Sequence, residues 1–310
     1  NRTGLSGRPQ LRVYASGEVH SSIDRAAWFS GIGEDNLVRI AVSGPLRAMV
    51  PEALDAAIRA DLAAGRVPAG VVACVGGTST GAMDDVGAVV DVAHHHGLFV
   101  HVDAAWAGAA MICPEFRPLW AGAERADSIV LNPHKWLGVQ FDCSAHFIRN
   151  VDDHLRTLAL QPEYLKTHGK DDIVNFNEWT IQLGRRFRAL KLWFVLRAHG
   201  LEGLRGMIRD HVRWAGVLAE RLAAEPGFSL ASGPVLSLFS FRHDPGDGRD
   251  PDAHMLALLQ SINDGGAIYL TPTRVDGRLA IRFQAGAMDA TEQDVMAAFD
   301  IIRAAARALG

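Results

Sequence analysis

The order of apolar segments along the chain constrains its fold most strongly. Short apolar runs typical of buried strands, such as residues 71–75 and 128–131, alternate with helical segments through the first two thirds of the 310 residues. A strand that is apolar on both faces belongs to a sheet with helices on both sides, and such sheets are mostly parallel. The sequence therefore predicts an α/β fold built on a mostly parallel sheet.

The pattern changes after about residue 184, where long helical segments precede fewer strands. The first part is expected to contain strands at residues 11–14, 38–42, 71–75, 99–102, 128–131 and 143–148, with helices at 51–64 and 84–96. The second part is expected to contain helices at residues 185–199, 201–224, 252–262 and from 291, with strands at 235–241, 268–272 and 279–283. We therefore predict a large domain at residues 1–190 and a smaller α+β domain at residues 191–310.

Composition and charge exclude several classes of function. A net charge of −4 gives no reason to expect a nucleic acid or an anionic membrane as a partner. Three cysteines are too few for a disulfide framework and fit a reducing compartment. No apolar run approaches the roughly 18 residues of a membrane-spanning helix, and no secretory leader is evident. The sequence predicts a cytoplasmic enzyme.

Lysine is rare in this chain, which makes one of its lysines informative. There are four lysines against 27 arginines, and Lys135 alone follows a buried-looking strand, in the run Asn-Pro-His-Lys-Trp. A lysine that attacks an aldehyde needs surroundings that lower its pKa. Asp103, 32 residues earlier, ends another apolar strand and is followed by two small alanines. An amine and a carboxylate at neighbouring strand ends suggest pyridoxal phosphate, whose aldehyde and ring nitrogen need such partners.

Three other segments have both a structural and a functional interpretation. His20 can stack on an aromatic ring or donate a proton, although a histidine in a helix-capping segment is more often structural. The glycine-rich run at residues 76–81 follows an expected strand and can present N–H groups to an anion or simply form a turn. His94, His95 and His96 end an expected helix, and adjacent helix residues do not converge on one ion. No metal site is predicted.

Six runs of residues, in order along nearly the whole chain, match one family. They are residues 19–22, 101–108, 113–117, 132–136, 141–144 and 183–188. Together they resemble the group II pyridoxal phosphate-dependent amino-acid decarboxylases, particularly the aromatic-L-amino-acid decarboxylases. The resemblance implies the type I fold of pyridoxal phosphate-dependent transferases, a homodimer, and an aromatic amino acid as the small-molecule substrate.

The resemblance also implies roles for the residues around the cofactor ring. Lys135 would bind the cofactor aldehyde, and Asp103 would keep the ring nitrogen protonated. His20 would stack on one face of the ring, and Ala105 would lie under the other.

Further roles concern the rest of the cofactor. Thr78 would reach the phenolic oxygen of the ring, and Asn132 and His134 would help to hold the phosphate. Members of the family also carry an N-terminal dimerising segment and a phosphate loop upstream of the His20 region. Neither is found in these 310 residues, so we expect an N-terminal part of the family's chain to be missing here.

Three more residues bear on substrate and reaction. Tyr164 lies in a polar segment, residues 161–172, that is expected to close over the site, and the family uses its tyrosine to return a proton after carbon dioxide leaves. Trp136 and Gly184 are expected beside the substrate. In the family, glycine at the position of Gly184 tends to accompany bulky aromatic or indolic substrates, such as tryptophan, 5-hydroxytryptophan or dopa.

The main prediction is therefore decarboxylation of an aromatic L-amino acid to the amine and carbon dioxide. An oxidative aldehyde synthase is the first alternative, but such members typically lose the loop tyrosine or the stacking histidine, and this chain retains Tyr164 and His20. A catalytically inactive fragment is the second alternative. An aminotransferase is the third, on fold analogy alone.

Overall fold

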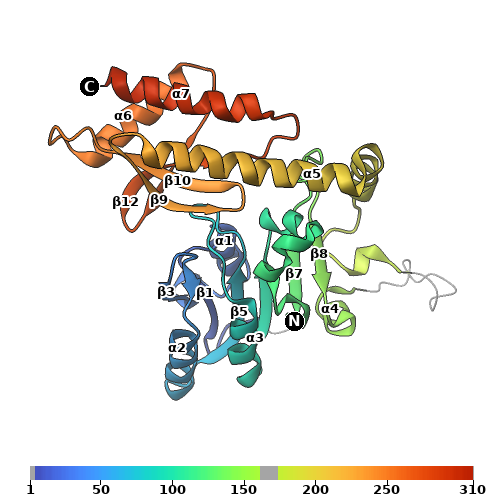
Figure 1. Ribbon diagram of the computed structural model, residues 1–310. Helices are drawn as coiled ribbons and strands as arrows, with labels where there is room; N and C mark the ends of the chain where they lie inside the picture. The colour runs from blue at the N-terminus through green and yellow to red at the C-terminus, as the bar shows by residue number, and fades with distance from the viewer. Residues whose placement is uncertain (1–3, 161–173, 310) are drawn as a thin grey trace.

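The computed structural model describes residues 4–160 and 174–309 and contains two main sheets. The larger sheet has six strands in the order β2-β1-β5-β6-β7-β8 (Figure 1). All neighbouring strands are parallel except β7 and β8. The bounds are Leu11–Ser16 (β1), Leu37–Ile40 (β2), Val67–Cys74 (β5), Phe99–Asp103 (β6), Ser128–Leu131 (β7) and Ala145–Ile148 (β8). The predicted mostly parallel sheet is confirmed.

The two faces of this sheet are covered differently. The helices of this region are α1 (Ser22–Phe29), α2 (Pro51–Ala63), α3 (Val86–His95) and α4 (Val151–Leu158), with short 3-10 helices at Glu34–Asn36, Ala107–Ile112, Pro114–Trp120, Ala123–Arg125 and Phe176–Glu178. Val102 faces the main core with α2 and α3, whereas Val72 faces a smaller cluster that includes Ala27 of α1. Because side chains alternate along a strand, Asp103 points to the face opposite Val102.

The start of α3 differs from the prediction by two residues, for a local reason. The Asp84 carboxylate accepts hydrogen bonds from the backbone N–H groups of Cys74 (2.6 Å) and Met49 (2.7 Å), so it is not free to enter the helix. Asp85 instead caps the helix by accepting from Ala88 N–H. Met49 lies in a short hairpin formed by β3 (Val42–Ser43) and β4 (Ala48–Met49). Asp84 thus attaches this hairpin to the end of β5.

The smaller sheet is antiparallel and has the order β11-β12-β10-β9. Its strands are Phe228–Val235 (β9), Leu238–His243 (β10), Thr271–Val275 (β11) and Arg278–Gln284 (β12), and α6 (Pro251–Asp264) and α7 (Glu292–Ala308) pack with it. The single strand predicted at residues 235–241 is wrong, because the chain turns at Leu236 and Ser237. Both turn residues are buried, so the apolar run continues through the turn and conceals it.

Helix α5 (Arg188–Ala224) connects the two parts, and in Figure 1 it runs above β9 and β10 and below α7. It is interrupted at Gly200, whose φ of 64° is left-handed, and this confirms the predicted break between two helical segments. Leu204 and Ile208 pack in the core of the large sheet, whereas Trp214 packs in the core of the small one. The domain limits at residues 1–190 and 191–310 stay a prediction. In the described residues, no helix combines the length and the apolar character that a membrane crossing needs.

Candidate active site

The loops that follow β5, β6 and β7 meet at one edge of the large sheet. Asp103 is the last residue of β6, and its register partner on β5 is Cys74. Lys135 follows β7, in a turn in which its own N–H donates to the Asn132 carbonyl (2.9 Å) and its carbonyl accepts from Gly138 N–H (3.1 Å). In parallel sheets the carboxyl ends of neighbouring strands share an edge, which is where ligands bind. The fold therefore brings together the amine and the carboxylate that the sequence singled out.

The Lys135 amine has a perturbed pKa. Surrounding protein atoms desolvate the side chain and lower its pKa below the ordinary value of 10.5. The Asp103 charge opposes this lowering of the pKa, and the Arg282 charge adds to it. A lysine whose pKa is lowered has a larger neutral, nucleophilic fraction near neutral pH, as attack on a carbonyl requires.

Asp103 is buried and held in place by its own loop. Its Oδ1 accepts a hydrogen bond from Ala105 N–H at 3.1 Å, and the relative exposure of the residue is 9%. The small side chain of Ala105 lines the same cavity. His101, two residues earlier on the same strand face, lies 2.7 Å from Ser128 Oγ through Nδ1. Burial lowers the pKa of His101, which keeps a second positive charge away from this wall.

The His20 ring is oriented by the start of α1. Its Nδ1 accepts from Ser22 N–H (3.1 Å) and lies 2.9 Å from Ser22 Oγ. Because Nδ1 is an acceptor, the neutral ring carries its proton on Nε2. His20 lines the cavity together with Thr78 and Lys135. Sequence reasoning alone favoured a structural histidine here, and the structure places this one at the cavity wall.

The glycine-rich run at residues 76–81 is a folded turn. The N–H groups of Gly76 and Gly77 donate to the Ala82 carbonyl, and the Gly81 N–H donates to the Gly77 carbonyl. These three donors are therefore used inside the loop and do not face an anion. Gly76 has φ of 93°, and a Cβ there would lie 2.5 Å from the Ala107 Cβ. Thr78, at the tip of the turn, lines the cavity.

Asn132 and His134 differ in their relation to the cavity. Asn132 lines it, and its Oδ1 is buried without a hydrogen-bond partner in the described residues. His134 is not one of the described residues that line the cavity. Its Nδ1 lies 2.7 Å from the Cys143 carbonyl oxygen and 3.0 Å from Cys143 N, and its ring lies edge-on to Phe141.

Three more predicted site residues have different positions. Trp136 lines the cavity but is almost fully buried, and its indole N–H donates to His211 Nδ1 at 3.0 Å. Gly184 is exposed and has no atom within 4 Å of a Cβ built on it. Tyr164 lies outside the described residues. The expected roles of all three stay predictions.

The C-terminal sheet contributes a wall that sequence reasoning missed. Arg282 and Gln284 of β12 line the cavity opposite Lys135, together with Gly286 and Ala287. Arg282 Nε is buried without a hydrogen-bond partner in the described residues, and burial lowers the guanidinium pKa. One sequence signal existed, because an arginine interrupts the otherwise apolar run 279–283.

The cavity has two lobes of about 490 and 410 Å³. Both lobes are lined by His20, Thr78, Trp106 and Lys135, so they are continuous. One lobe extends to Asp103 and Asn132, and the other extends to Arg282 and Gln284. The first therefore offers groups for a cofactor ring, and the second offers a buried cation to an anionic group.

A family comparison agrees with this arrangement. Residues 4–244 match the model of the pyridoxal-dependent decarboxylase conserved domain. The chain belongs to this family. The family's tryptophan decarboxylase TDC2 of Camptotheca acuminata is 39% identical over 99% of this chain and 63% of its own length. Tyrosine decarboxylase 2 of Arabidopsis thaliana is 39% identical over 97% of this chain and 56% of its own length.

Solved structures of pyridoxal-dependent decarboxylase relatives superpose closely on this chain. The Oryza sativa TDC crystallised with PLP and tryptamine has a TM-score of 0.94 and 36% identity, covering 99% of this chain and 64% of that one. The Rhodiola rosea 4-hydroxyphenylacetaldehyde synthase has a TM-score of 0.89 and 30% identity, with the same coverage of each chain. The predicted type I fold is confirmed. This chain spans about 60% of the length of the curated relatives it matches.

The residues of this pyridoxal-dependent decarboxylase domain fit pyridoxal phosphate. Asp103 accepts one backbone hydrogen bond at the cavity wall and, as a carboxylate, can accept another from a protonated ring nitrogen. The buried Asn132 Oδ1, unpartnered in the described residues, is an atom that a ligand or water has to satisfy. Lys135 supplies an amine with a lowered pKa.

Proposed function

We propose that this chain carries the catalytic residues of a decarboxylase that uses pyridoxal phosphate and acts on an aromatic L-amino acid. The observation that carries the proposal is the pairing of Lys135, whose pKa is lowered, with buried Asp103 at the edge of one cavity. Family membership supports the same reaction.

Each wall of the cavity has a separate task in this proposal. Lys135 holds the cofactor aldehyde, Asp103 holds a proton on the ring nitrogen, and His20 covers the ring. When bound, the cofactor supplies an electron sink for the pair released as the carboxylate leaves. Asp103 favours that acceptance because its fixed negative charge keeps the ring nitrogen positive.

Arg282 binds and orients the substrate carboxylate. Its guanidinium is buried in the second lobe, and Gln284 is its only side-chain hydrogen-bond partner among the described residues. A buried cation with unused donors gains most from an anion that arrives with the substrate. Holding the carboxylate from the C-terminal side fixes which bond of the α-carbon can break.

Proton return and water exclusion complete the reaction. By resemblance to the family, Tyr164 returns a proton to the α-carbon after carbon dioxide leaves. His20 has its Nε2–H available to the cavity because Nδ1 is bonded to Ser22. Trp106 and Trp136, whose rings are 5.3 Å apart, form an apolar wall that limits water at the reacting atoms.

The aromatic wall and the relatives support an aromatic substrate. Trp106 and Trp136 line the lobe that holds Arg282, so an aromatic ring entering with its carboxylate on Arg282 meets indole surfaces. The matched relatives are named for tryptophan and for tyrosine. Gly184, expected beside the substrate, favours indolic or dopa-like rings.

The oxidative aldehyde synthase is the second candidate. A solved relative is such a synthase, so the fold serves both reactions. The retention of His20 and Tyr164 favours simple decarboxylation here. We further propose that the active protein is a cytoplasmic homodimer.

A substrate panel tests the proposal directly. The purified protein is supplied with pyridoxal phosphate and then with tryptophan, 5-hydroxytryptophan, dopa, tyrosine, phenylalanine, histidine or glutamate. We expect amine and carbon dioxide from at least one aromatic substrate. Stoichiometric peroxide and ammonia would establish the aldehyde synthase instead. Failure to develop the visible absorbance of lysine-bound cofactor would identify an inactive fragment.

A further inference from the structure

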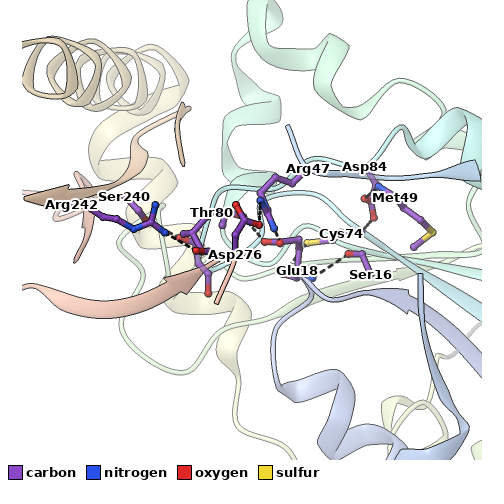
Figure 2. Close-up of polar contacts among 12 residues, drawn as sticks. Ser16, Glu18, Arg47, Met49, Cys74, Thr80, Asp84, Ser240, Arg242 and Asp276 are labelled. Atoms are coloured by element: carbon purple, nitrogen blue, oxygen red, sulfur yellow. Dashed lines mark hydrogen bonds and ion pairs between the residues drawn. The ribbon is translucent and has the colours of Figure 1, made fainter. Parts of the chain in front are cut away.

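A buried carboxylate, Glu18, joins three segments of the chain next to the cavity. Its Oε1 accepts from Arg47 Nε at 2.7 Å, and its Oε2 accepts from Thr80 Oγ1 at 2.5 Å (Figure 2). The Glu18 side chain is only 11% exposed. Glu18 precedes His20 by two residues, and Thr80 follows Thr78 by two residues. The carboxylate therefore links the two loops that carry His20 and Thr78.

Arg47 extends this link to the C-terminal sheet. Its Nη1 lies 3.0 Å from Asp276 Oδ1, in the turn between β11 and β12. We call Glu18, Arg47, Thr80 and Asp276 the Glu18 bridge. Arg47 and Asp276 have φ of 51° and 52°, a left-handed conformation that residues other than glycine rarely adopt. Both residues lie in hairpin turns, β3–β4 for Arg47 and β11–β12 for Asp276, in which a left-handed residue is part of the turn geometry, so the turns fix the backbone at both ends of the ion pair.

The turn that carries Asp276 is itself fixed to the small sheet. Arg242 on β10 donates to the Val275 carbonyl (2.6 Å) and, through Nε, to the Leu279 carbonyl (3.0 Å). In Figure 2 Arg242 and Ser240 lie to the left of Thr80 and Asp276. A displacement of the turn therefore moves the strand that follows it.

Two further contacts meet at the same junction. Ser240 Oγ donates to the Ser79 carbonyl at 3.0 Å. A Cβ on Gly81 would lie 2.9 Å from the Val235 Cβ, so the two backbones approach closely there. The loop at residues 76–81 is consequently in contact with the C-terminal sheet on one side and with Glu18 on the other.

The strand that begins next to Asp276 also provides the far wall of the cavity. Six residues after Asp276, Arg282 faces the cavity, and Gln284 follows it. His20 and Thr78 form the near wall. We propose that Arg47 is a positioning residue: by bridging Glu18 and Asp276 it sets the separation between the His20 and Thr78 wall and the Arg282 and Gln284 wall. This rests on the proposed function, in which a substrate spans both walls.

The test combines hydrogen exchange with kinetics on the purified protein. The variants are Arg47→Met, which keeps the length of the stem without its charge, Arg47→Lys, Asp276→Asn and the double variant Arg47→Met with Asp276→Asn. Asp300→Asn is the matched control, because it breaks an exposed Arg–Asp pair on α7. Exchange is followed in peptides covering residues 16–22, 76–83 and 276–284, with and without pyridoxal phosphate. KM and kcat are measured for the best aromatic substrate.

We expect Arg47→Met to speed exchange in those three peptides and to raise KM on the order of fivefold with kcat nearly unchanged, the scale of one ordinary net hydrogen bond, because Arg47 acts on the substrate only through the walls that it positions. Asp276→Asn should raise KM only about twofold, since Asp276 is 72% exposed and surface pairs are weak. The double variant should match Arg47→Met, because the two residues act through one contact. Arg47→Lys should recover part of the loss.

Three results would overturn the proposal. In the first, Arg47→Met has the same KM and the same hydrogen-exchange pattern as the control Asp300→Asn. The second is faster exchange spread evenly over the chain with KM unchanged, which would mean a purely structural role. The third is an additive double variant. If the unsubstituted protein fails to bind the cofactor, the proposed function fails, while the exchange pattern still decides whether Arg47 links the two walls.

Discussion

The two walls of the cavity are built in different ways. The wall from the large sheet consists of loops at the ends of adjacent parallel strands, and its main residues, Lys135 and Asp103, lie in short recognisable runs. The opposite wall is part of an antiparallel strand, with Arg282 147 positions after Lys135. In the proposed function, the first wall holds the cofactor, and the second orients a substrate. Reactivity and orientation are thus separated, and each wall can be tested alone.

Removal of Lys135 should have the largest effect, because the near wall loses its amine. We expect Lys135→Ala to abolish the visible absorbance of the bound cofactor and to lower kcat/KM at least about a thousandfold, as is usual for a deleted covalent group. Lys191→Ala is the control, since that lysine lies on α5 outside the cavity. Unchanged absorbance in Lys135→Ala would contradict the assignment.

The next effect should come from Asp103→Asn, which keeps the shape of the near wall and removes its charge. We expect kcat to fall about a few hundredfold, the scale of one lost charge-stabilising group. Because Asp103 raises the pKa of Lys135, the variant should also lower that pKa further. The pH dependence with which an acylating reagent modifies the Lys135 amine in the cofactor-free protein measures the change in pKa, and a rise would count against the proposed pairing.

The buried Asp84 supports the near wall of the cavity, and its titration makes the free energy of unfolding of the protein depend on pH. Burial raises the Asp84 pKa from its ordinary 3.8 to about 6. A carboxyl group whose pKa is higher in the folded state than in the unfolded state stabilises the folded protein most at pH values below the unfolded-state pKa. This contribution is lost as the pH rises through the folded-state pKa. The difference between the two pKa values corresponds to about 3 kcal/mol of stability, lost as pH rises from about 4 to about 6.

Urea unfolding across pH 4 to 7 measures this contribution. In Asp84→Asn we expect the free energy of unfolding to decline less over that interval than in the unsubstituted protein. At pH 4 the Asn variant should be less stable than the unsubstituted protein, because the N–H groups of Cys74 and Met49 then share one carbonyl acceptor. An identical pH dependence in both proteins would exclude Asp84 as the titrating group.

The smallest of these effects should come from the far wall, through Arg282→Gln. We expect KM for the amino acid to rise on the order of thirtyfold, the scale of a lost charged hydrogen bond, with the cofactor absorbance retained. Arg274→Gln is the control, because Arg274 is an exposed arginine of the same sheet that pairs with Asp252. Loss of the cofactor absorbance in Arg282→Gln would place Arg282 at the cofactor and contradict its proposed role at the substrate carboxylate.

Sequence patterns predicted the large sheet better than the small one. The strand at residues 128–131 coincides with β7, because an apolar parallel strand is bounded by polar loops. The single strand expected at residues 235–241 covers the turn between β9 and β10, because Leu236 and Ser237 in that turn are as buried as the strands themselves. Asn132 lies at the cavity, whereas His134, two positions later, turns to Cys143. Neighbouring positions in one motif can thus have different surroundings.

By itself the sequence determined which chemical groups stand at the ends of the parallel strands. Lys135 and Asp103 could be singled out because residue type, a preceding apolar strand and, for Asp103, small following side chains are all local properties. Only the tertiary structure placed Arg282 opposite Lys135 and connected Glu18 through Arg47 to Asp276. Those contacts depend on how the small sheet packs against the loops of the large part, and packing between distant segments leaves no periodic signal in the chain.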